Sequence, residues 1–200
     1  MRLPDSEHTS RPWRIHALAP DFRLEDVWAL PTPGGPDDFP LLVQGLAAGD
    51  PGKDPSWPAR TLFAIRWKLG EILGWDDDGT GIGARVPTLR DRLPADLRDG
   101  DRGPEFDALP FRPLYLTGDE FAAELANGTM HGVLHLGWVR DAAGFHGQMA
   151  VLVKPNGLLG SAYMAAITPF RRLIVYPRTM EQIGRVWRAQ RAAAETTLAR

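Results

Sequence analysis

The sequence predicts an α+β fold in which an antiparallel β-sheet wraps around a long C-terminal helix, with additional helices near the N-terminus. Short segments with helical apolar spacing occupy the first half of the chain, and β-like runs separated by turn sequences follow them. The last part carries an apolar stripe at helical spacing, formed by Ile183, Val186 and Trp187. The length of 200 residues is enough for one domain with a substantial core.

Composition narrows the class of protein. A hydrophobic fraction of 44% and a charged fraction of 24% are typical of a globular domain. The formal net charge of -2 gives no general electrostatic reason to expect nucleic acid or an anionic membrane as a partner. The absence of cysteine excludes disulfides, thiolate chemistry and thiolate metal sites. No segment resembles a signal peptide or a spanning helix, so a cytoplasmic location is expected.

The N-terminal segments are predicted from their apolar patterns. Residues 1–10 are polar and lack periodicity, so a flexible N-terminus is expected ahead of a single domain over residues 11–200. Residues 11–17 alternate apolar and polar side chains, which predicts a half-buried strand. A short helix is expected to begin at Pro20 and to include Trp28.

Two further helices and a long connection complete the first half. Phe39 to Ala48 form a short helix in this interpretation, and residues 58–74 have the clearest amphipathic spacing of the first half. Residues 76–110 are rich in Asp, Arg, Gly and Pro. We expect a long surface connection there, with a turn or two of helix near Thr88–Leu93.

The second half is predicted to be a meander of antiparallel strands at residues 112–117, 121–126, 129–139 and 145–154. Asn127-Gly128 between two apolar runs is a strong hairpin signal. A capped helix over 117–127 is the competing interpretation, because Thr117 and Glu120 have the spacing of a capping box. The strongly β-like run at 129–139 favours the hairpin.

The pattern becomes helical again after Asn156-Gly157. A helix is expected over Leu158–Thr168, followed from Pro169 by the long C-terminal helix, which ends near Ala194. Pro177 should break or kink that helix, because proline removes a backbone donor and clashes with the preceding turn.

A two-residue turn at Asn127-Gly128 would fix the register of the first hairpin. It would place Glu124 opposite His131 and Glu120 opposite His135. In the next hairpin, Leu136 would lie opposite Met149 and Leu134 opposite Val151. Side-chain alternation then gives one apolar face, with Phe121, Leu125, Met130, Leu134, Leu136, Trp138, Met149, Val151 and Val153. The other face is polar, with Glu120, Glu124, His131, His135, His146 and Gln148 beside Val133 and Leu152.

The polar face has two interpretations. The favoured one is a solvated outer face on which cross-strand Glu–His pairs contribute little stability. The other is a catalytic cluster formed by Glu120, Glu124, His131 and His135, in which a carboxylate orients each imidazole for general acid–base chemistry. No metal site and no cofactor are expected.

The apolar face supplies the candidate ligand-binding residues. They combine aromatic rings with flexible methionines, which suit an apolar pocket. These candidates are Phe121, Met130, Leu134, Trp138 and Met149. Tyr115 and Tyr163 are added because their hydroxyl groups could reach a cavity.

Several short motifs resemble those of the bacterial DUF2867 proteins. They are Trp13, Asp21-Phe22, Val27-Trp28, Arg66–Gly70, Glu124-Leu125, Thr129–Gly132, His135–Trp138, Gln148–Val151, Gly160–Met164 and Pro169–Pro177. The resemblance covers about residues 11 to 195. The family in turn resembles the helix-grip group (SRPBCC, Bet v 1-like), which implies a cavity between the sheet and the C-terminal helix. A fold resemblance gives an expectation of a cavity and not of a reaction.

Three functions follow as hypotheses. The first is binding of a small apolar or aromatic molecule in a cavity between the sheet and the C-terminal helix. The second is a small lyase, cyclase or dehydratase that uses the His–Glu cluster, and the third is a structural or partner-binding role. The expected partner is a small ligand, without nucleic acid or membrane, and the sequence leaves a homodimer open.

Overall fold

The computed structural model describes residues 1–49, 82, 86–127, 130–157, 173 and 176–198. The helices predicted over 58–74 and 158–168 and the candidate Tyr163 lie outside the described residues. The strands are β1 (Arg2–Leu3), β2 (Arg23–Ala29), β3 (Arg112–Leu116), β4 (Glu120–Ala126), β5 (Met130–Asp141) and β6 (Gly144–Pro155). The helical segments are α1 (Ser6–Thr9), α2 (Ile15–Leu18), α3 (Phe39–Ala47), η2 (Leu89–Arg92), α5 (Ala95–Arg98) and α7 (Tyr176–Leu198).

The strands form one antiparallel sheet in the order β1-β2-β6-β5-β4-β3. Consecutive strands β3 to β6 are a meander, as the turn sequences predict. The hairpin interpretation of 121–139 is confirmed. The competing capped helix over 117–127 is excluded, because residues 120–126 pair with β5 and residues 121–124 also pair with β3. The predicted α+β class is confirmed, with α7 packed against the sheet.

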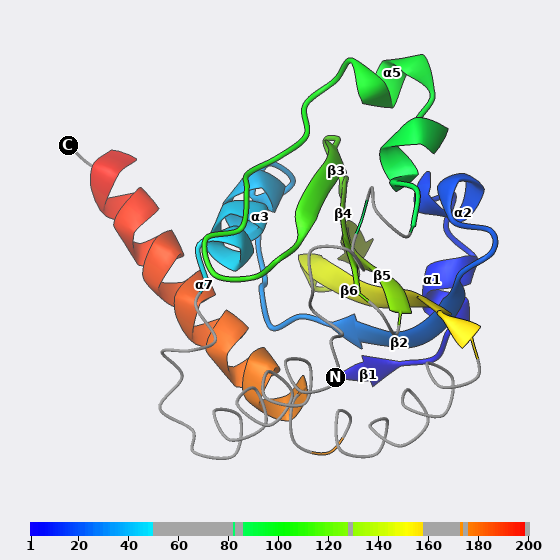
Figure 1. The fold of residues 1–200 in the computed structure, drawn as a ribbon. Helices are drawn as coiled ribbons and strands as arrows, with labels where there is room; N and C mark the ends of the chain where they lie inside the picture. The colour runs from blue at the N-terminus through cyan, green and yellow to red at the C-terminus, as the bar shows by residue number, and fades with distance from the viewer. Residues whose placement is uncertain (50–81, 83–85, 128–129, 158–172, 174–175, 199–200) are drawn as a thin grey trace.

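Helical segments cover both faces of the sheet (Figure 1). The helices α3 and α7 pack on one face, where an apolar core cluster contains Phe39, Phe121, Leu136, Trp138 and Trp187 among its members. The segments α1, α2, η2 and α5 lie on the other side. A second core cluster there joins the sheet to buried side chains of Trp13, Ile15, Leu18, Leu89, Leu93 and Leu97.

The structure corrects three predictions near the N-terminus. Residues 1–10 are not loose, because β1 pairs with β2 and His8 of α1 is buried. The strand predicted over residues 11–17 is wrong, since Ile15 begins helix α2. The helix predicted from Pro20 to Trp28 is also wrong: residues 23–29 form β2, held between β1 and β6. A strand with neighbours on both sides and helices on both faces shows no clean alternation.

The connection over 76–110 is less exposed than its composition predicts. The turn of helix near Thr88–Leu93 is confirmed as η2. However, Leu89, Leu93 and Leu97 recur at intervals of four and are all buried in the second core cluster. The described part of this segment is therefore a covering layer of the sheet rather than a surface connection.

Pro177 lies in the first turn of α7 as the structure describes it. Proline is tolerated there, because the first backbone N–H groups of a helix have no intrahelical acceptor and the fixed φ suits helix entry. The predicted break therefore coincides with the beginning of the described helix, and α7 then runs on to Leu198.

One of the two predicted registers is confirmed and the other is displaced by two residues. In the β5–β6 hairpin, Leu136 lies opposite Met149 as predicted. In the β4–β5 hairpin, Ala126 lies opposite His131 and not opposite Thr129, so the turn predicted at Asn127-Gly128 is wrong in position. The backbone N–H of Asn127 donates to the Met130 carbonyl at 2.9 Å, and the Met130 N–H donates to Asn127 Oδ1 at 3.1 Å, so the hairpin closes between Asn127 and Met130 instead of between Ala126 and Thr129. A displacement of two preserves the face of every side chain.

We expect Leu136→Ala to lower the free energy of unfolding by about 2–5 kcal/mol, because the side chain is fully buried between the sheet and its helices. Leu173→Ala is the control, since Leu173 is 76% exposed and its truncation should cost less than about 0.5 kcal/mol. Chemical denaturation measures both. Similar losses for the two variants would contradict the assignment of the core.

Candidate functional site

The carboxylate of Glu120 is buried under α2, at the beginning of β4. It accepts backbone hydrogen bonds from Arg14 and Ile15, at 2.9 and 3.0 Å. It also accepts from the Tyr115 hydroxyl at 2.5 Å and from His135 Nε2 at 3.0 Å. The backbone donors belong to the first turn of α2, so this one carboxylate fastens the helix to the sheet.

Three histidines continue the network away from Glu120. His135 Nδ1 lies 3.1 Å from His8 Nε2, and His8 Nδ1 lies 3.2 Å from Nε2 of the half-buried His16. When all three rings are uncharged, one tautomer assignment satisfies every contact. Each Nε2–H then donates toward Glu120, and each Nδ1 except that of His16 accepts from the next ring.

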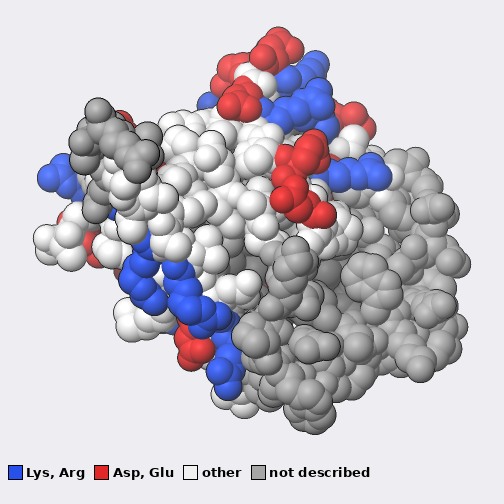
Figure 2. All heavy atoms as spheres, turned by 90° about the vertical axis from the view of Figure 1, so that its left-hand side faces the viewer, with Lys and Arg blue, Asp and Glu red and all other residues white. Residues whose placement is uncertain are grey.

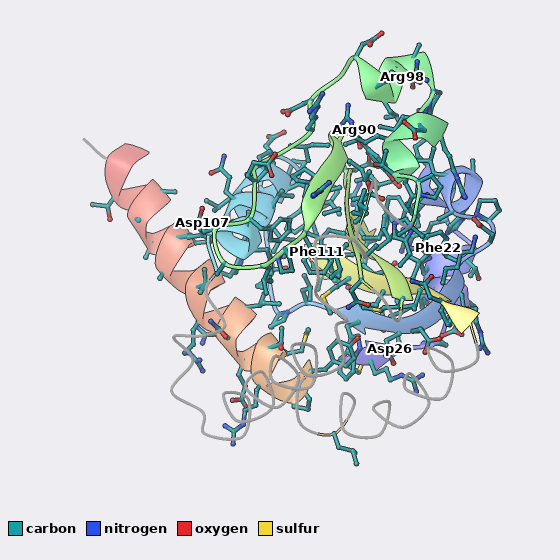
Figure 3. The ribbon with its side chains drawn as sticks, in the orientation of Figure 1. Phe22, Asp26, Arg90, Arg98, Asp107 and Phe111 are labelled. Atoms are coloured by element: carbon teal, nitrogen blue, oxygen red, sulfur yellow. The ribbon has the colours of Figure 1, made fainter. Side chains whose placement is uncertain are left out.

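Glu124 forms a second, similar anchor four residues further along strand β4. Its carboxylate accepts from the Thr88 hydroxyl, from the Leu89 backbone at 3.0 Å and from His131 Nε2 at 2.8 Å. The ring of Phe22, labelled in Figure 3, meets His131 edge-on with centroids 4.9 Å apart. Glu124 therefore fastens the beginning of η2 to the sheet as Glu120 fastens α2.

The two anchors set the charge states of their members. Burial alone raises the pKa of Glu120, but hydrogen bonds from His135 and Tyr115 outweigh it and the net pKa shift is downward. The pKa of Glu124 is lowered in the same way, with His131 and Leu89 as the main donors against burial. Burial, and then the neighbouring His135 and His16, lower the pKa of His8 to about 3. The carboxylates are thus ionised and the His8 ring is uncharged at neutral pH.

The interpretation of the polar face as solvated is wrong. Glu120, Glu124, His131 and His135 are each at most 3% exposed, and Gln148 is buried beside them. The segments α1, α2 and η2 cover this face, and none of them was recognised from the sequence as a covering layer. His146 is an exception, half-buried with Nδ1 3.3 Å from an Asp141 oxygen.

The structure distributes the predicted ligand-binding residues over three places. Phe121, Leu134, Trp138 and Met149 lie on the face that α3 and α7 cover. Met130 is half-buried at the beginning of β5. Tyr115 is on the opposite side, bound to Glu120, and burial followed by that carboxylate raises the pKa of its hydroxyl. The described candidates therefore do not converge on one cavity.

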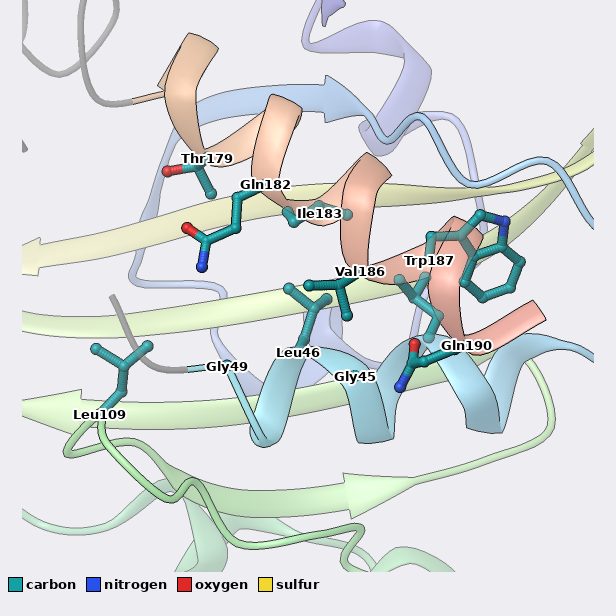
Figure 4. A pocket seen from close by; sticks show the side chains of 11 residues that line it. Gly45, Leu46, Gly49, Leu109, Thr179, Gln182, Ile183, Val186, Trp187 and Gln190 are labelled. Atoms are coloured by element: carbon teal, nitrogen blue, oxygen red, sulfur yellow. The ribbon is translucent and has the colours of Figure 1, made fainter. Parts of the chain in front are cut away.

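A groove lies between α3 and α7 instead, with a volume of about 100 Å³ (Figure 4). The described residues that line it are Leu42, Gly45, Leu46, Gly49, Leu109, Thr179, Gln182, Ile183, Val186, Trp187 and Gln190. None of the described ligand or catalytic candidates is among them. The apolar stripe of Ile183, Val186 and Trp187 was recognised as helical, but only the packing of α7 beside α3 shows that part of it faces a groove.

The described part of the chain contains no group of three or more His, Asp and Glu side chains arranged to hold a metal ion. Among the described helices, none combines the length and the apolar character that crossing a membrane requires. The polar face consists of carboxylates and imidazoles that are hydrogen-bonded to one another and to the backbone.

We expect Glu120→Ala to destabilise the fold by about 3 kcal/mol or more, because it leaves buried donors of α2, Tyr115 and His135 without an acceptor. Glu105→Ala removes an exposed carboxylate and should change the stability by less than about 0.5 kcal/mol. Urea denaturation compares the two variants. A loss below about 1 kcal/mol for Glu120→Ala would mean that the anchor is dispensable.

The His8 ring predicts a loss of stability in acid. Between its ordinary pKa of 6.5 and the folded value of about 3, the unfolded chain binds a proton that folded His8 does not bind. The free energy of unfolding should therefore fall as pH decreases through this window, by up to about 1.4 kcal/mol per pH unit. His8→Gln removes this contribution, so the stability advantage of the wild type over the variant should shrink from pH 7 to pH 4. An advantage that stays constant over this range would refute the assignment.

Comparison with known proteins places the chain in a family. No curated protein and no solved structure shows significant similarity to it. Residues 18–178 match the family model described as "Protein of unknown function (DUF2867)". The match covers most of the chain, including β2 to β6 and the beginning of α7. The predicted resemblance is confirmed at this level, and the chain belongs to the DUF2867 family.

Proposed function

We propose that this protein binds a small apolar or aromatic molecule, and that the ligand lies in the groove between α3 and α7. The observation that carries the proposal is the lining of this groove, in which Leu46, Ile183 and Val186 surround an open apolar recess. The site differs from the cavity expected between the sheet and the C-terminal helix, because core side chains such as Trp138 and Met149 occupy that space.

The size of the groove limits the ligand. Its volume of about 100 Å³ is somewhat smaller than the ~150 Å³ cavity that accommodates benzene in an engineered protein. A single aromatic ring or a short branched hydrocarbon fits that space, whereas a whole long-chain lipid does not. The groove is open to solvent on one side, so a larger ligand would bind through one ring-sized part.

The state of the His–Glu cluster favours binding over acid–base catalysis. Glu120 already accepts four hydrogen bonds from protein groups, and Glu124 accepts three. The described residues that line the groove include none of these side chains. A general base needs hydrogen-bond reach to a substrate proton, and the proposed ligand would lie on the other side of the sheet.

Exposure also favours a small ligand over a protein partner. In the described part of the chain, the large hydrophobic side chains that are exposed are Met1 and Leu173. Partner-binding faces usually present a contiguous apolar patch of several hundred square ångströms. Two isolated side chains do not form such a patch, whereas the groove is a concave apolar surface suited to a small molecule.

Filling the groove tests the proposal. Val186→Trp should weaken the binding of toluene at least about ten-fold, because the indole would occupy the volume between α3 and α7. Ala189→Trp is the matched control, since Ala189 is exposed on the same helix and does not line the groove. Ligand-observed NMR measures the affinity, and amide shifts locate the site. Equal binding by the wild type and Val186→Trp, or no binding by the wild type, would refute the proposal.

A further inference from the structure

A glycine in α3 makes room for a glutamine of α7 at one end of the groove. Gly45 lies within α3, where glycine is less favourable for a helix than alanine. A Cβ atom at this position would collide with the side-chain amide of Gln190, at 2.8 Å from Nε2 and closer still to Oε1. The missing side chain therefore lets this amide lie directly against the backbone of α3, as Figure 4 shows.

Gln190 belongs to a row of groove-lining residues along α7. Gln182, Val186 and Gln190 are spaced by four residues, which places them on one side of the helix. An apolar section is thus flanked by two amides about 12 Å apart along the axis. Within the described part of the chain, no residue hydrogen-bonds to either amide, so no described group competes with a ligand for their donors and acceptors.

The described lining of the groove is also uncharged. No Asp, Glu, Lys or Arg is among the described residues that line it. Arg178, Arg185 and Arg188 of α7 are exposed instead. Figure 2 shows basic side chains gathered on this surface of the molecule. Arg191 pairs with Asp38 instead of entering the groove. An anionic ligand would lose hydration in this groove without gaining a cation as partner.

We propose that the groove selects uncharged ligands that combine an apolar ring with an amide or carbonyl group, and that Gln190 recognises this polar group. Gly45 acts as a positioning residue, because its lack of a side chain leaves the space that the amide of Gln190 occupies against α3. A carboxamide ligand can both donate to and accept from a glutamine amide, so the pair satisfies both groups without charge. This inference rests on the proposed function and adds a ligand class to it.

Three probes with one ring test the selectivity: toluene, benzamide and benzoate. We expect the wild type to bind benzamide at least about ten-fold more tightly than benzoate, measured by ligand-observed NMR at pH 7. Gln190→Leu should weaken benzamide binding about three- to ten-fold, the effect of one net hydrogen bond, and should leave toluene binding unchanged. Gln44→Leu is the matched control, because Gln44 is an exposed glutamine of α3 that does not line the groove.

Gly45→Ala tests the positioning role separately. Alanine favours the helix, so the melting temperature should stay the same or rise unless the displaced amide strains the packing. Benzamide binding should nevertheless weaken as in Gln190→Leu, with toluene binding retained. A merely structural role for Gly45 would change both affinities together or neither.

The outcomes distinguish the two proposals. The wild type could bind toluene, lose this binding in Val186→Trp, and still bind benzamide and benzoate with equal affinity. That result would overturn the inference and leave the proposed function intact. An unchanged benzamide-to-toluene affinity ratio in Gln190→Leu would also overturn it, whether or not Gly45→Ala folds. If none of the three probes binds the wild type, both the proposed function and the inference fail.

Discussion

The buried carboxylate of Glu120 is the constraint on which one whole side of this protein depends. An ionised carboxylate inside a protein is tolerated only when hydrogen bonds replace the water that it has lost. Its donors come from the backbone of α2, from Tyr115 in β3 and from His135 in β5. The edge strand β3, the central strand β5 and helix α2 must therefore assemble together. Each of them supplies hydrogen bonds that replace water around the same carboxylate.

Glu124 repeats this arrangement on the same strand and the same face, with donors from η2 and β5. Two carboxylates thus hold two separate stretches of chain against the sheet, before β2 and before β3. Neither stretch has a long helix of its own, since α2 and η2 span four residues each. Short helices are marginal without tertiary contacts, and a charged anchor at the helix beginning supplies one. The polar face is accordingly a buried contact between the sheet and its covering segments. The groove between α3 and α7 lies on the apolar side.

Sequence patterns predicted the parts of the fold in which local signals agree. The meander from β3 to β6, helix α3 and the long C-terminal helix have strong periodicity or clear turn residues. The assignment of side chains to two faces is confirmed, because it depends on alternation and a displacement by two residues does not change it. The predicted pairing of Glu120 with His135 holds as a hydrogen bond although the strand register differs, since a diagonal neighbour is within reach of long side chains.

Elements that depend on distant partners could not be predicted in this way. The burial of the polar face follows from segments at residues 6–18 and 88–98, whose short helices form only against Glu120 and Glu124. Neither His8 nor His16 was recognised as part of the cluster, because they lie more than 100 residues from His135 in sequence. The groove was missed for the same reason, since its two walls come from opposite ends of the chain.

The shape of the groove depends on the loop that precedes α3 and contacts the middle of α7. The indoles of Trp138 and Trp187 donate to the carbonyls of Gly35 and Pro33, each at 3.0 Å. Between them lies Gly34, where a Cβ atom would come within 3.1 Å of both rings. One indole belongs to the sheet and the other to α7, so this loop joins the helix to the sheet immediately before α3 begins. These hydrogen bonds and this close packing thus hold α3 and α7 at their distance within the protein itself, and a groove formed in advance would lower the entropic cost of the ligand binding that we propose.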